Sequence, residues 1–191
     1  MSRAGYVLTG GRSSRMGHDK ALLPFRGGTL AAFVAREVRQ AAGSATLVGD
    51  PESYDSLGLP VIPDLYPGEG PLAGILTALA HTAADYNLVT ACDLPAISAA
   101  FLGLLLDAAE TSGANAFIPT HPVSGLPEPL CAVYHRRALP AIEAAFGRGV
   151  RKVMAAFEDP GGGLRAVRFE TSEVASFQNV NTPEEWACVD L

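Results

Sequence analysis

Short apolar segments that alternate with helix-forming segments constrain the fold of this chain more than any other feature. Residues 87–91 form an apolar run of the kind found in parallel strands that are covered on both faces. Other strand-like segments occur along the whole chain, at residues 4–8, 45–48, 59–62, 114–118, 130–134, 164–169 and 177–180. Because helical patterns separate these segments and no internal repeat occurs, we predict an α/β fold with a doubly wound, mostly parallel sheet flanked by helices.

The helices are predicted from apolar spacing and from their end residues. In the clearest case, residues 30–41 follow the capping residue Thr29 and end at Gly43. The last helix is expected after Thr182, where a capping box is combined with Pro183 at the first helical position. Further helices are expected at residues 51–57, 72–79, 98–112, 136–146 and 150–157.

The length and composition fit one globular unit. With 191 residues, of which 48% are apolar and 18% charged, the chain is expected to form a single domain over residues 1–191. Since no apolar stretch has the length of a bilayer span or a signal peptide, we expect a cytoplasmic protein without a membrane partner. Cys92, Cys131 and Cys188 are widely spaced, so they suggest neither a disulfide framework nor a zinc site.

The charges are unevenly distributed along the chain. The net charge of −6 argues against a nucleic-acid partner, because affinity for a phosphate backbone needs an excess of cations. Half of the 14 Lys and Arg residues nevertheless fall early in the chain, namely Arg3, Arg12, Arg15, Lys20, Arg26, Arg36 and Arg39. A local excess of cations in an acidic protein fits a small anionic ligand better than a polymer.

A glycine-rich segment joins the first predicted strand to these cations. Gly10 and Gly11 allow backbone conformations that other residues avoid and leave amide N–H groups able to face an anion. Arg12, Arg15 and Lys20 add full positive charges, as the oxygens of a nucleoside triphosphate would require. The alternative interpretation is a tight strand-to-helix turn with solvated cations.

Two common phosphate-binding patterns do not fit this segment. A Walker A loop needs G-x-x-x-x-G-K-[ST], but here His18 and Asp19 stand between Gly17 and Lys20, so the lysine is out of register. The dinucleotide fingerprint G-x-G-x-x-G is absent as well. Asp64, residues 70–74 and Asp93 also follow predicted strand ends, so we expect them to meet the glycine-rich segment at one edge of the sheet.

The complete segment 8–20, L-T-G-G-R-S-S-R-M-G-H-D-K, closely resembles the pattern L-A-G-G-x-S-x-R-M-G-x-D-K of the molybdenum cofactor guanylyltransferases, the MobA family of nucleotidyltransferases. The resemblance continues in order through Gly70-Pro-Leu-Ala-Gly74, Cys92-Asp-Leu-Pro95, Glu128-Pro-Leu-Cys-Ala-Val-Tyr134 and Asn179-Val-Asn-Thr-Pro-Glu-Glu185. It covers essentially the whole chain. It implies a Rossmann-like nucleotidyltransferase fold whose N-terminal part binds the nucleotide and whose C-terminal part binds the acceptor.

The resemblance also implies a reaction. Members of the family transfer GMP from GTP to the terminal phosphate of molybdopterin or Mo-molybdopterin and release pyrophosphate. By resemblance, Arg15 and Lys20 hold the nucleotide phosphates and are catalytic together with Asp93, which is the ligand of the cofactor Mg²⁺. Molybdenum cofactor insertion proteins and molybdoenzyme chaperones are the protein partners that the family suggests.

The nucleotide-binding residues implied by the resemblance are Leu8, Thr9, Gly10, Gly11, Lys20, Asp64, Gly70, Pro71, Leu72, Gly74 and Asp93. For Asp93 the alternative is a role in a turn or helix cap, and for Asp64 a turn before Pro67. For residues 70–74 it is tight packing at the start of a helix, which is compatible with a close approach of the backbone to guanine.

The acceptor-binding residues implied by the resemblance are Asn179, Asn181 and Arg151. The side-chain amides of the two asparagines are able to pair with the ring nitrogens of a pterin. Alternatively, Asn181 belongs to the cap of the last helix, and Arg151 lies on a solvated helix face next to Lys152.

Three residues depart from the family pattern. Thr9 replaces a usual alanine, no asparagine occurs near Gly49, and Glu128 stands where glutamine is common. These departures leave open a cytidylyltransferase or another nucleotidyltransferase that acts on a related pterin or a sugar phosphate. A non-catalytic chaperone that binds GTP or molybdopterin is a second alternative, against which Lys20 and Asp93 together argue.

Overall fold

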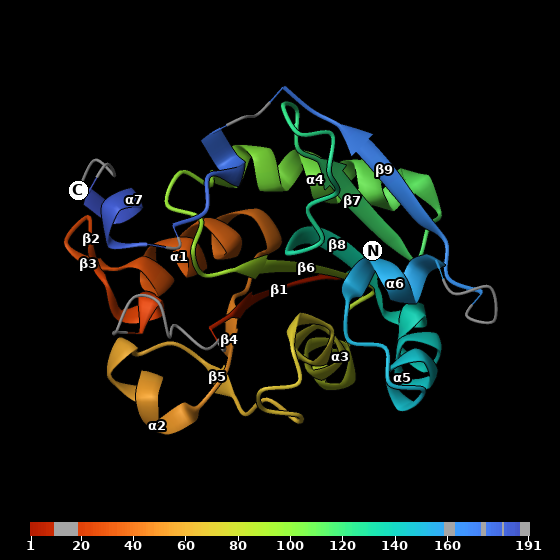
Figure 1. Cartoon of the computed structure of the whole chain (residues 1–191), viewed down its shortest axis with the longest axis horizontal. Coiled ribbons are helices and arrows are strands. Elements are labelled where there is room, and N and C mark those ends of the chain that lie inside the picture. The colour runs from red at the N-terminus through yellow and green to blue at the C-terminus, as the bar shows by residue number, and fades with distance from the viewer. Residues whose placement is uncertain (10–18, 159–162, 173–174, 181, 188–191) are drawn as a thin grey trace.

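The computed structural model describes residues 1–9, 19–158, 163–172, 175–180 and 182–187 (Figure 1). Seven strands form one sheet in the order β5-β4-β1-β6-β8-β7-β9. They are β1 (Arg3–Leu8), β4 (Thr46–Val48), β5 (Val61–Ile62), β6 (Tyr86–Ala91), β7 (Ala116–Thr120), β8 (Cys131–His135) and β9 (Ala166–Glu170). A separate antiparallel hairpin pairs β2 (Pro24–Phe25) with β3 (Gly28–Thr29).

The helices lie between the strands, as the alternating sequence pattern predicts. They are α1 (Leu30–Ala42), α2 (Pro51–Tyr54), α3 (Pro71–His81), α4 (Ala99–Ser112), α5 (Leu139–Gly147), α6 (Val153–Glu158) and α7 (Pro183–Ala187). Short 3₁₀ turns are η1 (Lys20–Leu22), η2 (Asp55–Leu57), η3 (Arg136–Ala138) and η4 (Ala175–Phe177). Thr29 caps α1 through its side chain and Gly43 ends it in the left-handed conformation, so the sequence-based bounds of this helix are confirmed.

The central strands run parallel and end together. Leu8 at the end of β1 is in register with Val48 of β4 and with Ala91 of β6. Strand β8 is antiparallel to both β6 and β7, whereas the other neighbouring pairs of this sheet are parallel. The carboxyl ends of β4, β1 and β6 therefore form one edge, which is where open α/β sheets bind ligands.

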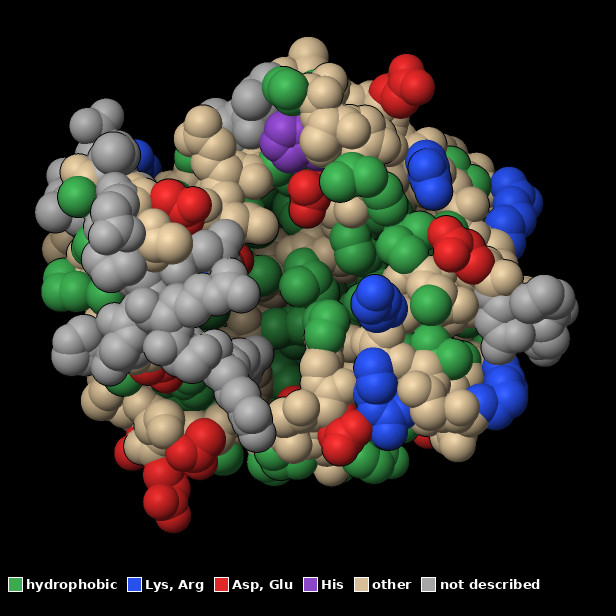
Figure 2. All heavy atoms as spheres, viewed as in Figure 1, with side chains coloured by type: hydrophobic (Ala, Val, Ile, Leu, Met, Phe, Trp, Pro, Cys, Tyr) green, Lys and Arg blue, Asp and Glu red, His purple; other side chains and the backbone are tan. Residues whose placement is uncertain are grey.

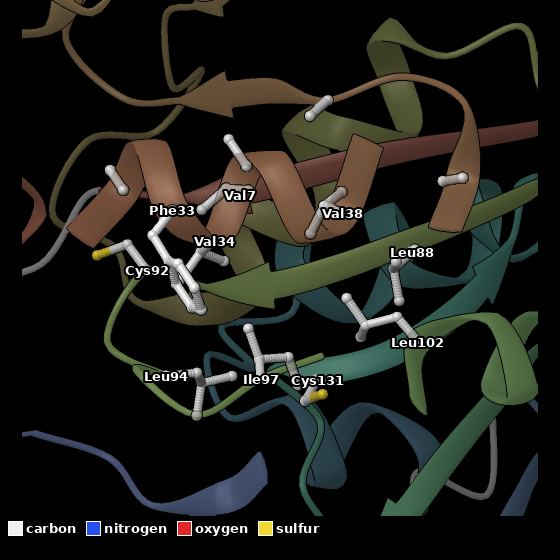
Figure 3. Close-up of a cluster of buried hydrophobic side chains, with 14 of the residues drawn as sticks. Val7, Phe33, Val34, Val38, Leu88, Cys92, Leu94, Ile97, Leu102 and Cys131 are labelled. Carbon is white, nitrogen blue, oxygen red and sulfur yellow. The ribbon is translucent and has the colours of Figure 1, made fainter. Parts of the chain in front are cut away.

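Helices cover both faces of the sheet (Figure 1). The two helices α1 and α4 pack together on one face, and α3 and α5 pack together on the other. Figure 3 shows the core on the α1 side, where Val34 and Val38 of α1 face Val7 of β1 and Leu88 of β6. Because apolar side chains are buried on both faces of β1 and β6, the predicted doubly wound α/β fold is confirmed.

One predicted strand is wrong. Residues 177–180 do not join the sheet, although both Phe177 and Val180 are buried. The ring of Phe177 packs edge-on against Phe101 of α4, with ring centroids 5.3 Å apart, and the amide of Val180 donates to the carbonyl oxygen of Asp93. The side chains of this segment are therefore apolar because they pack against α4 and the end of β6, not because the segment pairs as a strand.

Among the helices in the described ranges, none combines the length and the apolar character required to cross a bilayer.

Candidate active site

A cleft of about 940 Å³ opens at the carboxyl ends of the central strands. Its walls carry residues that lie one or two positions after the ends of four strands: Thr9 after β1, Gly49 after β4, Asp64 after β5 and Asp93 after β6. This volume lies within the range of roughly 300–1,000 Å³ that is usual for small-molecule sites. On the face shown in Figure 2, a hollow with mainly hydrophobic side chains at its floor opens near the middle of the molecule. The parallel sheet thus brings together polar groups that are far apart in the sequence.

Lys20 and Asp93 meet in this cleft. Lys20 begins the turn η1, and its Nζ lies 3.4 Å from Oδ2 of Asp93, which follows β6. Both side chains are largely buried, with 15% of Lys20 and 19% of Asp93 exposed. The main chain fixes the aspartate from two sides, because Cys92 N donates to Leu8 O and Val180 N donates to Asp93 O. The pair is therefore held where the first strand, the sixth strand and the C-terminal segment converge.

Asp64 combines a place in the cleft with the turn role that was its alternative interpretation. Its Oδ1 accepts hydrogen bonds from the amide of Tyr66, at 3.1 Å, and from the hydroxyl of Thr77, at 2.9 Å. Thr77 belongs to α3, so the carboxylate ties the loop after β5 to that helix. Asp64 also lines the cleft, which leaves its nucleotide contact compatible with the turn.

The start of α3 contributes backbone to the cleft. Gly70, with φ of +90°, precedes Pro71 at the first position of the helix, and both residues line the cleft. Leu72 and Gly74 are buried below them and lie outside its lining. A Cβ added at Gly74 would lie 3.0 Å from Leu8 Cδ1, so this glycine allows α3 to pack closely on β1. The packing alternative thus holds for Gly74, and the nucleotide roles of Leu72 and Gly74 stay predictions.

Two of the predicted acceptor residues, Arg151 and Asn179, lie outside the cleft lining. Arg151 contacts Glu69 through Nε at 2.5 Å, and its Nη1 donates to the carbonyl oxygens of Phe146 and Val150. Its guanidinium also stacks on the ring of Phe146, 4.0 Å from the centroid. Asn179 is exposed next to Val180, the residue bonded to Asp93. Gly10, Gly11, Arg15 and Asn181 lie outside the described residues.

Two residues of the cleft were not singled out from the sequence. The hydroxyl of Tyr54, the last residue of α2, donates to Oδ2 of Asp19 at 2.6 Å and approaches Thr9 O at 3.2 Å. Asp19 was visible as part of the pattern around Lys20, but nothing in the sequence links it to Tyr54. Burial, and then the bond to Asp19, raise the pKa of Tyr54 well above its ordinary value, so its hydroxyl stays protonated and acts as a donor.

The cleft offers no activated thiol. Cys92 lines it, but burial strongly raises the pKa of its thiol, so this group stays protonated near neutral pH. Within the described ranges, no group of three or more His, Cys, Asp or Glu side chains is arranged to hold a metal ion.

A solved structure has the same fold. The chain superimposes on the 2-C-methyl-D-erythritol 4-phosphate cytidylyltransferase of Thermus thermophilus with a TM-score of 0.73 and 17% identity, covering 97% of this chain and 96% of the other. At that identity the likeness concerns the fold alone. The mostly parallel sheet of this chain, with a cleft at its carboxyl edge, therefore has the same fold as that enzyme.

The chain belongs to the MobA-like NTP transferase family, whose domain model matches residues 5–161. The molybdopterin-guanine dinucleotide biosynthesis protein A of Archaeoglobus fulgidus is 30% identical, with a TM-score of 0.80 over 96% of this chain and 95% of that one. A probable molybdenum cofactor guanylyltransferase of Deinococcus radiodurans is 36% identical, over 95% of this chain and 90% of that protein. One of Carboxydothermus hydrogenoformans is 32% identical, over 94% and 91%.

Proposed function

We propose that this chain transfers GMP from GTP to molybdopterin or its molybdenum-bearing form. An oxygen of the acceptor's terminal phosphate attacks the α-phosphorus of GTP, a new P–O–P linkage forms, and the bond to the β-phosphate breaks to release pyrophosphate. The observation that carries the proposal is the Lys20–Asp93 pair in the cleft, in a chain similar over nearly its full length to probable molybdenum cofactor guanylyltransferases. No protein nucleophile is required, in keeping with the protonated Cys92.

In this proposal Lys20 neutralises the nucleotide phosphates. The reaction brings two anions together and places further negative charge on the leaving pyrophosphate. A largely buried ammonium group acts more strongly on such charge than a solvated one, because little water screens it. Lys20 is held beside Asp93 before substrate arrives, so little reorganisation is needed at the moment of transfer. Arg15 joins Lys20 in this role as a prediction from the family pattern.

Asp93 fits Mg²⁺ as a cofactor. This ion commonly binds one or two protein carboxylates and completes its shell with phosphate oxygens and water. Asp93 is a carboxylate at a strand end that lines the cleft, and the described residues offer no larger cluster of ligands. When bound there, the ion would supply positive charge to the phosphate oxygens of the nucleotide.

The remaining groups divide between nucleotide and acceptor. Leu8, Thr9, Gly70 and Pro71 line the cleft and offer main-chain groups to the nucleotide, with Asp64 beside them. Asn179 and Asn181 are assigned to the pterin, and Arg151 to the acceptor phosphate, which would replace Glu69 as its partner. The predicted cytoplasmic location and the protein partners suggested by the family stay predictions.

One assay tests the proposal. Purified protein is incubated with Mg²⁺, molybdopterin and each nucleoside triphosphate in turn, and pyrophosphate release is followed together with the mass of the pterin product. We expect release with GTP and formation of the guanine dinucleotide. Faster release with CTP would make the chain a cytidylyltransferase. Binding of GTP without any release would instead support a non-catalytic binding module.

A further inference from the structure

Tyr54 occupies an unusual position relative to the glycine-rich segment. Its hydroxyl contacts Thr9, the residue directly before segment 10–18, and Asp19, the residue directly after it. Tyr54 belongs to α2, which follows β4 and comes later in the chain than both Thr9 and Asp19. Its side chain lines the cleft. A single side chain thus holds the two ends of this segment together.

The two contacts differ in strength. One hydroxyl has one proton, and the 2.6 Å distance to Asp19 Oδ2 marks the carboxylate as its main acceptor, with Thr9 O at 3.2 Å as the weaker partner. A short bond to a carboxylate is stronger than one between neutral groups. Tyr54 is 4% exposed, so water competes little for either acceptor.

Asp19 passes this restraint on to Lys20. Its other oxygen, Oδ1, accepts from the amide of Ala21 at 2.9 Å and so caps the turn η1, whose first residue is Lys20. Because both of its oxygens accept hydrogen bonds, the carboxylate of Asp19 has one orientation. This orientation fixes the position of η1 relative to Tyr54. The position of Lys20 beside Asp93 therefore depends on a hydroxyl that touches neither residue.

We propose that Tyr54 is a positioning residue for nucleotidyl transfer, which acts through Asp19 to pre-order the turn that carries Lys20. The inference rests on the proposed function for the identity of the ligand, a nucleoside triphosphate. Because Tyr54 holds Asp19, the cap of η1 is in place before the ligand binds. In Tyr54→Phe the ring packing remains, but this ordering must then accompany nucleotide binding and weakens it.

The kinetic test compares Tyr54→Phe with Tyr86→Phe. The control also removes a buried tyrosine hydroxyl that donates to one carbonyl, Glu110 O at 3.4 Å, but it lies at the opposite end of β6 from Asp93. We expect Tyr54→Phe to raise KM for GTP roughly tenfold while kcat stays within about threefold, since bound phosphates restore the order at saturation. The control variant keeps both constants. Equal effects of the two substitutions would overturn the proposal.

Coupling to Asp19 separates positioning from general packing. If Tyr54 acts through Asp19, the double variant Tyr54→Phe/Asp19→Ala raises KM no further than Asp19→Ala alone. If the effects of the two substitutions on KM multiply in the double variant, Tyr54 does not act through Asp19 and the inference is overturned.

Amide hydrogen exchange supplies a readout that needs no catalysis. We expect the Ala21 amide to exchange faster in Tyr54→Phe than in wild type or Tyr86→Phe, because its acceptor Asp19 is no longer held. Unchanged exchange overturns the inference whether or not the protein transfers GMP. If wild type transfers no nucleotide, the proposed function fails separately, and the exchange of Ala21 still decides whether Tyr54 orders the turn.

Discussion

Lys20 and Asp93 are 73 positions apart in the chain, yet Lys20 Nζ lies 3.4 Å from Asp93 Oδ2. Neither residue is in a strand. Lys20 begins the turn η1 and Asp93 lies just beyond β6, at the carboxyl edge where the parallel strands β1 and β6 end in register. The fold therefore forms this charged pair, and the proposed mechanism uses both of its members.

Removal of either side chain is expected to abolish most of the activity. Lys20→Ala and Asp93→Ala should each reduce GMP transfer by at least roughly a hundredfold, the scale of a lost electrostatic contact at a transition state. Transfer is measured as pyrophosphate release with GTP and molybdopterin. Arg39→Ala and Asp55→Ala, which remove charges of the same sign from exposed positions, serve as controls. Near-normal transfer in either site variant would remove that residue from the mechanism.

A second prediction concerns the close fit around Gly49. A Cβ at this position would lie 2.2 Å from Thr9 Oγ1 and 2.9 Å from Tyr54 Cε2. Gly49→Ala should therefore reduce the free energy of unfolding by about 1–3 kcal/mol, the range for overpacking a buried site. Thr9→Ala in the same chain should recover part of the loss, because it removes the nearer atom.

The control for Gly49→Ala is the same substitution in α4. Gly103 has open space where its Cβ would be, so Gly103→Ala should stabilise the protein by roughly 0.5–1 kcal/mol through helix propensity. Urea denaturation of wild type and these three variants measures the differences. Equal stability of Gly49→Ala and wild type would show that the loop after β4 shifts readily.

These contacts show what the sequence alone could predict. Strand and helix periodicity located the central strands and α1, since burial on two faces or along one stripe leaves a local pattern. The segment 177–180 was misassigned because a buried irregular segment has the same short apolar composition as a strand. Local composition does not distinguish pairing with a sheet edge from packing on a helix such as α4.

The site was predictable only where chemistry requires a particular residue type. Lys20, Asp64 and Asp93 follow strand ends or belong to a recognisable pattern, and the structure places all three on the cleft. Tyr54 belongs to no recognisable sequence pattern, because its role depends on a hydrogen bond between α2 and Asp19 that only the folded chain forms. Thr9 was identified as a departure from the family pattern, but only the structure shows that its hydroxyl occupies the space beside Gly49.

The half-buried carboxylate of Glu128 gives a prediction about pH. Burial raises the pKa of Glu128, nearby His121 opposes this shift and Asp93 adds to it. Ionised Glu128 therefore opposes folding, because the unfolded chain releases the proton more readily. As pH rises from the ordinary glutamate value of about 4.3 through the raised folded-state pKa, this residue should progressively lower stability.

Replacement of Glu128 by glutamine tests this sign. Glu128→Gln should be more stable than wild type near neutral pH, and the difference should vanish below about pH 4, where both states of wild type are protonated. Glu143→Gln removes a carboxylate from an exposed position of α5 and is the matched control. The measurement is urea unfolding across this pH range. A gain that persists unchanged at low pH would contradict the prediction.

Arg151 has to exchange its ion-pair partner Glu69 for a phosphate if it binds the acceptor. Their ion pair is exposed, with 40% of the Arg151 side chain and 49% of the Glu69 side chain accessible, so it contributes less than about 1 kcal/mol. A phosphate with up to two negative charges can therefore displace the carboxylate. The main-chain bonds to Phe146 and Val150 meanwhile keep the guanidinium in place.

Glu69→Gln removes this competing charge and should lower KM for molybdopterin about threefold, by less than 1 kcal/mol, without changing KM for GTP. Asp107→Asn, which removes one of the two carboxylates paired with Arg3, controls for the change in net charge. Steady-state kinetics with each substrate varied in turn separate the two constants. Glu69 directly precedes Gly70, so the ion pair could instead order the loop before α3 for the nucleotide. In that case Glu69→Gln would raise KM for GTP, and Arg151 would serve the nucleotide rather than the acceptor.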